Sequence, residues 1–214
     1  MTTPLTDIEI RIVGSLMEKA LSTPDYYPLS LNALTAACNQ KSSRDPVVTY
    51  DESDVQVVLD ELEDKNLVNQ SRVGRVPKYE ELFSQKHNLV PKEVAVLCVL
   101  MLRGPQTVGE IRGRTGRLCV FDSLEAVNET LSTLAEWEFV QRQTRLPGRK
   151  ESRYAQILGG GVPETIEPAS TAPSVPESPA MAEQLQQIAT EVRQLRGEIE
   201  TLKEAFQTFK SQFE

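Results

Sequence analysis

The chain has 214 residues, of which 39% are hydrophobic and 25% are charged, and its formal net charge is −8. These values are ordinary for globular proteins and argue against a disordered or fibrous chain. The longest apolar run, from Val94 to Leu102, is nine residues, whereas a helix that spans a bilayer needs roughly 20. We therefore expect no membrane association.

The beginning of the chain and its cysteines both predict a cytoplasmic location. Asp7 and Glu9 stand where a secretory signal peptide has a basic start and an apolar middle. Cys38, Cys98 and Cys119 form no C-x-x-C pair, which is typical of free thiols in a reducing compartment.

The charge is distributed unevenly along the chain. Residues 1–85 hold 8 Lys and Arg against 14 Asp and Glu, residues 86–158 hold 11 against 8, and residues 159–214 hold 4 against 9. Only the middle part is expected to attract a polyanion.

One pattern of apolar anchors occurs twice, in residues 5–82 and 89–158. Early anchors recur 84 positions later, and late anchors recur 72 positions later. The first set is Leu5, Glu9, Leu16 and Met17, matched by Leu89, Glu93, Leu100 and Met101; the second is Val55, Leu59, Leu62, Leu67 and Val68, matched by Val127, Leu131, Leu134, Phe139 and Val140. This self-match predicts two homologous domains in tandem.

Capping residues place three helices in the first repeat. Thr6 and Glu9 have capping-box spacing and precede apolar positions at helical intervals. Ser30 precedes a second amphipathic stretch, and Asp51 or Ser53 can cap a third.

Strands are expected after the third helix of each repeat. Residues 67–72 and 76–82 have strand character on either side of a turn at Gly74, which predicts a hairpin. In the second repeat we expect helices at residues 92–102, 108–115 and 123–138, then strands at 139–146 and 152–158 around a Pro147-Gly148 turn.

Three helices followed by a two-stranded hairpin are the element order of a winged helix. The predicted fold is therefore mainly α with small β-hairpins (α+β), with two tandem winged-helix domains at residues 1–85 and 86–158. Trp137 is expected to seal the third helix of the second domain against its hairpin.

The last part of the chain has a different character. Residues 159–180 are rich in Gly, Pro, Ser and Thr and predict a disordered linker. Residues 181–214 carry a heptad pattern that predicts a coiled-coil helix and a parallel homodimer, and the alternative is a helix that folds back onto its own chain. The expected dimer contacts are Leu185, Ile188, Val192, Leu195, Ile199 and Leu202.

Catalytic chemistry finds little support in the sequence. His87 is the only histidine, and we expect a solvated residue between the repeats rather than a general base. No histidine, cysteine or carboxylate cluster has metal-ligand spacing, and the glycines at 109, 113 and 116 lack the ending of a phosphate loop. We expect a non-enzymatic protein without a metal or cofactor.

Duplex DNA is the most plausible ligand of a winged helix, but the third helices are acidic and unsuited to a major groove. The candidate DNA contacts are Arg112, Arg114, Arg117, Arg142, Arg145, Arg149, Lys150 and Arg153, which could follow a phosphate backbone or line a minor groove. The alternative is that these cations are solvated or pair with the acidic first repeat.

Three segments resemble the bacterial YceH-like family: Thr23 to Val55, GRVPKYEE from Gly74, and LPGRKESRYAQIL from Leu146. The resemblance covers roughly residues 5–158 and implies a tandem winged-helix protein without assigning an activity. It also draws attention to a polar loop as a candidate binding surface, although a hydrogen-bonded structural loop is an equal alternative. The loop residues singled out are Asn39, Gln40, Lys41, Arg44 and Asp45.

Two functional hypotheses follow. The first is a dimeric binding protein that contacts duplex DNA through the basic wing of its second domain. The second is an adaptor whose acidic helices contact a basic protein partner, without DNA binding.

Overall fold

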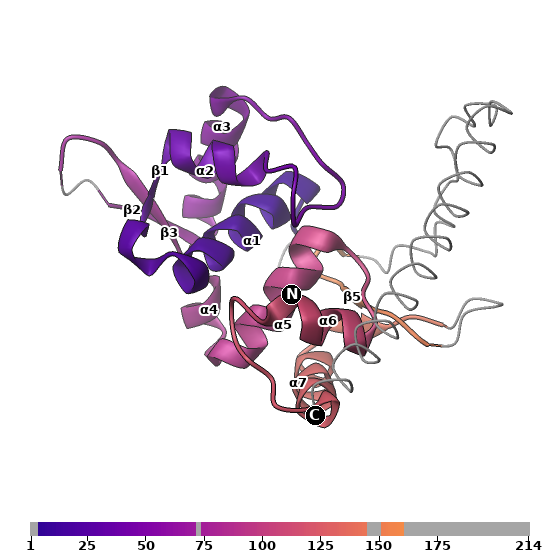
Figure 1. The fold of residues 1–214 in the computed structure, drawn as a ribbon. Coiled ribbons are helices and arrows are strands. Elements are labelled where there is room, and N and C mark those ends of the chain that lie inside the picture. Colours follow the sequence, from indigo (N-terminus) through magenta and orange to yellow (C-terminus); the bar gives the residue numbers. More distant parts are fainter. Residues whose placement is uncertain (1–3, 72–73, 145–150, 161–214) are drawn as a thin grey trace, which may run out of the picture. The chain divides into compact units, whose positions relative to one another are not determined.

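The computed structural model describes residues 4–71, 74–144 and 151–160 (Figure 1). The chain forms two compact units, residues 1–165 and 166–214, and all described residues belong to the first. The predicted coiled coil, most of the predicted linker, and Arg145, Arg149 and Lys150 lie outside the described ranges.

The first repeat consists of helices and one small antiparallel sheet. Its elements are α1 (Asp7–Ser22), the short 3-10 helix η1 (Pro24–Tyr26), β1 (Leu29–Ser30), α2 (Leu31–Cys38), α3 (Glu52–Asp64), β2 (Val68–Ser71), β3 (Lys78–Glu81) and α4 (Phe83–Lys86). The strand order is β1-β3-β2, with Tyr79 of β3 lying between Leu29 and Gln70.

The second repeat follows the same order. Its elements are α5 (Pro91–Arg103), α6 (Val108–Thr115), α7 (Leu124–Glu136), β4 (Val140–Arg142) and β5 (Tyr154–Gln156). Gln106 takes the place of β1, because its backbone exchanges two hydrogen bonds with Tyr154, of 2.9 and 2.8 Å. The mixed α+β fold is confirmed.

Capping side chains explain where the helices begin. Thr6 and Glu9 form the expected capping box: the Thr6 amide donates to Glu9 Oε2 at 2.8 Å, and the Glu9 amide donates to Thr6 Oγ1 at 3.4 Å. Of the two candidate caps of the third helix, Asp51 is the one used, since its Oδ1 accepts the Asp54 amide at 2.8 Å. The helices therefore begin where local hydrogen bonds satisfy their first amides.

Trp137 differs from its prediction. The residue follows the last turn of α7, and 43% of it is exposed. Its ring contacts Phe139 edge-on, with centroids 6.4 Å apart. The expectation that Trp137 seals the helix against the hairpin is wrong, because 43% of Trp137 is exposed whereas Leu131, Leu134 and Val140 are buried.

The two repeats dock through their first helices, α1 and α5, which have the most extensive contact between any two elements. Figure 1 shows α3 and α7 on opposite sides of this pair. Gly14 permits the close approach, since a Cβ there would lie 3.1 Å from both Leu102 Cδ2 and Met101 Cβ. Buried side chains of both repeats form one continuous core.

Candidate nucleic-acid interface and the cleft between the repeats

Two of the predicted DNA-binding cations are held within their own repeat. Arg153 contacts Glu110 Oε2 at 3.0 Å and donates to the Pro105 carbonyl at 2.7 Å. Arg114 hydrogen-bonds Gln106 and lies 3.9 Å from Glu110. Burial raises the pKa of Glu110. The hydrogen bond from the Thr107 amide and the charge of Arg153 outweigh burial, so the pKa of Glu110 is lowered. Arg114 and Arg153 therefore fasten α6 to the hairpin.

Arg112 is exposed and also has a structural role. Its Nε donates to the Phe121 carbonyl at 3.3 Å, and its Nη2 donates to the Asp122 carbonyl at 2.9 Å. These bonds hold the turn between α6 and α7 without neutralising the guanidinium charge.

Arg117 and Arg142 remain available to an outside ligand. Both are exposed, and within the described ranges neither guanidinium contacts a carboxylate. None of the five described candidate cations pairs with a carboxylate of the first repeat. Within the described residues, we therefore find no ion pair between the candidate DNA-binding cations and the acidic first repeat.

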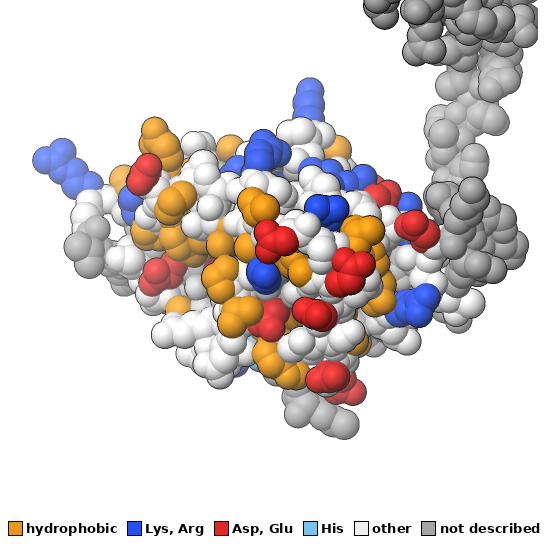
Figure 2. Space-filling view, turned by 60° about the horizontal axis from the view of Figure 1, so that its bottom comes forward, with side chains coloured by type: hydrophobic (Ala, Val, Ile, Leu, Met, Phe, Trp, Pro, Cys, Tyr) orange, Lys and Arg blue, Asp and Glu red, His pale blue; other side chains and the backbone are white. Residues whose placement is uncertain are grey.

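The third helices present acidic surfaces, as expected. On α3 the exposed residues include Glu52, Asp54, Asp60, Glu61, Glu63 and Asp64, and on α7 they include Glu125, Glu129 and Glu136. Neither helix contains a Lys or Arg. On the face shown in Figure 2, several Lys and Arg side chains lie toward the upper edge, most carboxylates lie lower, and hydrophobic side chains are spread over the whole face.

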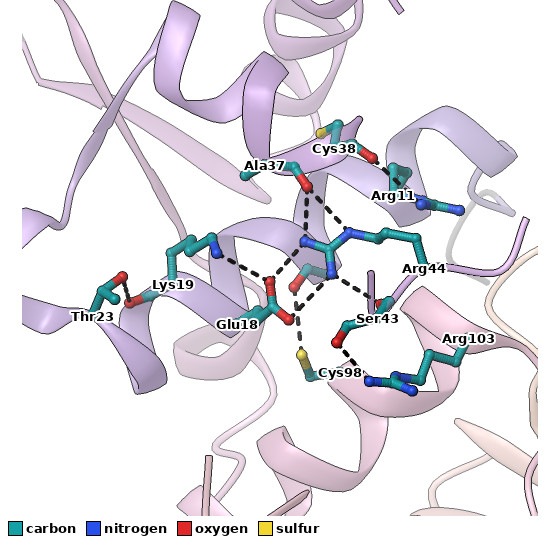
Figure 3. A network of polar contacts seen from close by, with 11 residues as sticks. Arg11, Glu18, Lys19, Thr23, Ala37, Cys38, Ser43, Arg44, Cys98 and Arg103 are labelled. Carbon is teal, nitrogen blue, oxygen red and sulfur yellow. Dashed lines mark hydrogen bonds and ion pairs between the residues drawn. The ribbon is translucent and has the colours of Figure 1, made fainter. Parts of the chain in front are cut away.

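The polar loop is built around Arg44, which is buried (Figure 3). Its five N–H donors all have acceptors: two bonds reach Glu18, two reach the Ala37 carbonyl and one reaches the Ser43 carbonyl. Asn39 clamps the far end of the loop through paired bonds to the Tyr50 backbone, of 2.7 and 2.8 Å. For these two residues the contacts favour the structural alternative.

The other loop residues behave differently. The Asp45 amide donates to the Leu102 carbonyl at 2.9 Å, which ties the loop to α5. Gln40 and Lys41 instead line a cleft, and Lys41 is exposed.

This cleft, which we call the basic cleft, lies between the repeats and has a volume of about 780 Å³. Its lining joins predicted residues from both groups, Gln40 and Lys41 of the polar loop and Arg114 and Arg117 of the second repeat. The remaining lining residues are Glu18, Lys19, Ser22, Thr23, Ser42, Ser43, Cys98, Val99, Leu102, Arg103 and Leu118.

Lys19 and Arg103 are functional candidates that the sequence reasoning missed. They stand 84 positions apart, the spacing of the early repeat anchors, so both occupy the same place in their repeats. The self-match could have identified them, but a cation at the end of a helix is usually a solvated residue. Burial and the charge of Arg114 lower the pKa of Arg103, and Arg117 adds to this effect.

A second hollow, the aromatic pocket, has a volume of about 440 Å³ and is lined by residues that include Phe83, His87, Trp137 and Phe139. The His87 ring lies 4.5 Å from that of Phe83 and 5.0 Å from that of Phe139, centroid to centroid. Burial, with the charge of Lys86, lowers the pKa of His87. His87 is therefore half-buried and packed against two aromatic rings, which the prediction of a solvated residue between the repeats did not include.

Neither metal binding nor membrane insertion is indicated for the described residues. They contain no group of three His, Cys, Asp or Glu side chains that could hold a metal ion. None of their helices combines the length and apolar character needed to cross a bilayer.

Comparison with known proteins gives one consistent result. A family model described as "Protein of unknown function, DUF480" matches residues 5–149. The UPF0502 protein of Solibacter usitatus is 56% identical over 165 residues, which cover 77% of this chain and 80% of that protein. The UPF0502 protein of Geotalea daltonii is 50% identical over 186 residues, which cover 86% of this chain and 85% of that protein. The UPF0502 protein of Opitutus terrae is 50% identical over 177 residues, which cover 80% of this chain and 77% of that protein.

Proposed function

The chain belongs to the DUF480 family, and we propose that it is a non-enzymatic, tandem winged-helix protein that binds the phosphate backbone of duplex DNA through its second repeat. The element order supports the winged-helix assignment, because each repeat has three helices followed by an antiparallel hairpin. In each repeat, a short segment before the second helix pairs with the hairpin. Leu29 pairs with Tyr79 in the first repeat, and Gln106 pairs with Tyr154 in the second. We also propose that the chain is a YceH-like protein.

The observation that carries DNA binding is the state of the exposed cations on the second repeat. No described carboxylate contacts Arg112, Arg117 or Arg142. Such cations on one repeat can displace counterions from a polyanion. The sequence adds Arg145, Arg149 and Lys150 nearby in the chain.

The mode of binding that we propose is contact with the backbone rather than base reading. Carboxylates on α3 and α7 would meet phosphates at the edges of a major groove, and neither helix offers an arginine for guanine contacts. Phosphate contacts fix a protein on DNA but carry little sequence information.

Charge reversal tests the proposal. Fluorescence anisotropy with a labelled mixed-sequence duplex would compare the wild type with Arg117→Glu and Arg142→Glu. The control is Arg75→Glu, which makes the same charge change at an exposed residue of the first repeat. We expect each second-repeat variant to weaken binding by about tenfold and the control to bind like the wild type. Equal affinities for all four proteins would contradict the proposal.

One feature of α3 favours the adaptor as a second candidate. Val57 is 59% exposed on a helix whose other exposed side chains are mostly acidic, and an apolar contact within a charged surface is typical of protein interfaces. Under this alternative Asp60→Lys would remove the interaction with a basic partner and Arg142→Glu would not. DNA binding should respond in the opposite way, weakening only in Arg142→Glu.

We also infer, from the heptad pattern alone, a parallel homodimer through the coiled coil. Light scattering on the intact chain and on a chain ending at residue 160 tests this inference. A dimer mass for the first and a monomer mass for the second support it. Monomer masses for both would favour the alternative of a helix folded onto its own chain.

A further inference from the structure

The basic cleft has a large excess of positive charge. Its cationic side chains are Lys19, Lys41, Arg103, Arg114 and Arg117, and the only carboxylate in its lining is that of Glu18. Both Glu18 oxygens already accept from Arg44, at 3.1 and 2.7 Å. Glu18 also lies 3.5 Å from Lys19, and Arg114 lies 3.9 Å from Glu110 outside the lining. Among the described residues, no carboxylate contacts the other three lining cations, Lys41, Arg103 and Arg117.

The cleft also holds its central cation in place. Arg103 Nη2 donates to Ser43 Oγ at 2.6 Å, and the Ser43 carbonyl accepts from Arg44 (Figure 3). Ser43 has a φ of 62°, so the backbone at this position is left-handed. A partly buried network therefore positions the Arg103 guanidinium before any ligand arrives, which lowers the conformational entropy that binding costs.

The remaining lining gives the cleft the character of a small-molecule site. Hydroxyls of Ser22 and Ser42 add hydrogen-bond donors, and Val99, Leu102 and Leu118 add apolar surface. A volume of about 780 Å³ falls within the range of pockets for small ligands.

We propose that the basic cleft binds a small molecule that carries a phosphate or pyrophosphate group. Arginines bind phosphate oxygens in pairs of charge-assisted bonds, and lysines bind them as point charges. Lys19 and Lys41 come from the first repeat, and Arg103, Arg114 and Arg117 come from the second. The bound anion joins the two repeats, so it stabilises their docking as well as its own site. This ligand is distinct from the proposed DNA partner, although the two sites share Arg117; Arg142 lies outside the cleft lining and separates them.

The test uses the full chain and inorganic pyrophosphate, with sodium sulfate at equal ionic strength as the comparison. Calorimetry should give saturable pyrophosphate binding, and the melting temperature should rise with pyrophosphate concentration. Arg103→Gln and Lys41→Gln should each weaken binding by about tenfold. Lys41 is exposed, so its variant leaves the fold intact even if Arg103→Gln does not.

Arg142→Gln is the matched control, because Arg142 is exposed and lies outside the cleft lining. It should bind pyrophosphate like the wild type, even though the DNA proposal predicts that it loses affinity for a duplex. Pyrophosphate binding that is absent, equal to that of sulfate, or unchanged in both cleft variants would overturn the inference. None of these outcomes would contradict the DNA proposal, which is tested separately with a labelled duplex.

Discussion

The Sγ atom of Cys98 lies 3.5 Å from the carbonyl oxygen of Gly14, and these two residues occupy the same position in the two repeats. Contact between equivalent positions is the property of a self-complementary interface. Lys19 and Arg103 also occupy equivalent positions, and both line the basic cleft. The repeats therefore dock like the subunits of a symmetric dimer, and their duplicated surfaces have diverged around the shared contact.

The first prediction concerns Gly14. A valine there would push against Leu102 and Met101, so Gly14→Val should lower the free energy of unfolding by about 2 kcal/mol. The matched control is Gly113→Ala in α6, where a Cβ meets no heavy atom within 4 Å. It should stabilise by about 0.5–1 kcal/mol through helix propensity. Urea unfolding measures both, and an undisturbed Gly14→Val variant would show that close docking is unnecessary.

The second prediction concerns the buried ion pair. The Arg44 side chain is fully buried, and 14% of the Glu18 side chain is exposed. Arg44→Met removes the side-chain donor of the Ala37 carbonyl and leaves the Glu18 carboxylate with only its 3.5 Å contact to Lys19, and should cost about 3 kcal/mol in urea unfolding. Adding Glu18→Gln should recover part of this loss, because the unpaired charge is then gone. A double variant as unstable as the sum of both single variants would refute the coupling.

The third prediction is a dependence of stability on pH. Burial raises the pKa of Glu9, but bonds from Lys65 and Thr6 outweigh burial and hold it below its ordinary value. The stabilisation from Glu9 is therefore complete above a pH of about 4.3, the ordinary pKa of a glutamate, and is lost as the pH falls through the folded-state pKa.

Urea unfolding of the wild type and of Glu9→Gln measures this effect. The wild type should be more stable by about 1.5 kcal/mol at pH 7, and the difference should shrink toward pH 3. Glu63→Gln, a change at an exposed carboxylate of α3, controls for the loss of charge. A difference that is constant with pH would count against the Lys65 and Thr6 contacts.

The fourth prediction separates two aromatic residues of the aromatic pocket. Phe83 is 3% exposed and Trp137 is 43% exposed. Phe83→Ala should therefore cost about 3 kcal/mol in the free energy of unfolding, and Trp137→Ala should cost less than about 1 kcal/mol. Similar losses for the two variants would show that Trp137 is part of the core after all.

Local patterns were enough to predict the three main helices and the hairpin of each repeat, but not η1, β1 or α4. The second helix of the second repeat is found at the predicted residues 108–115, and the strands lie inside their predicted ranges. These features depend on neighbours within a few residues, such as the Asp51 cap and its Asp54 amide. The added strand β1 is only two residues long and depends on Tyr79, far along the chain.

The site was harder to predict, because its contacts join distant segments. Arg44 was placed on a surface loop as a charged residue in a polar run, but Glu18 and the end of α2 bury it. Lys41 and Arg117 were both candidates, yet nothing in their spacing showed that one cleft contains them. Only the docking of α1 on α5 brings these positions together.

The most direct test of the central claim is the salt dependence of DNA binding by the intact chain. Backbone contact predicts that log K falls linearly with log salt concentration, with a slope of about −0.9 for each phosphate neutralised. Arg142→Glu should make that slope shallower by about 1. Absence of binding at low salt, or an affinity that does not change with salt, would contradict the proposal that the second repeat binds the phosphate backbone.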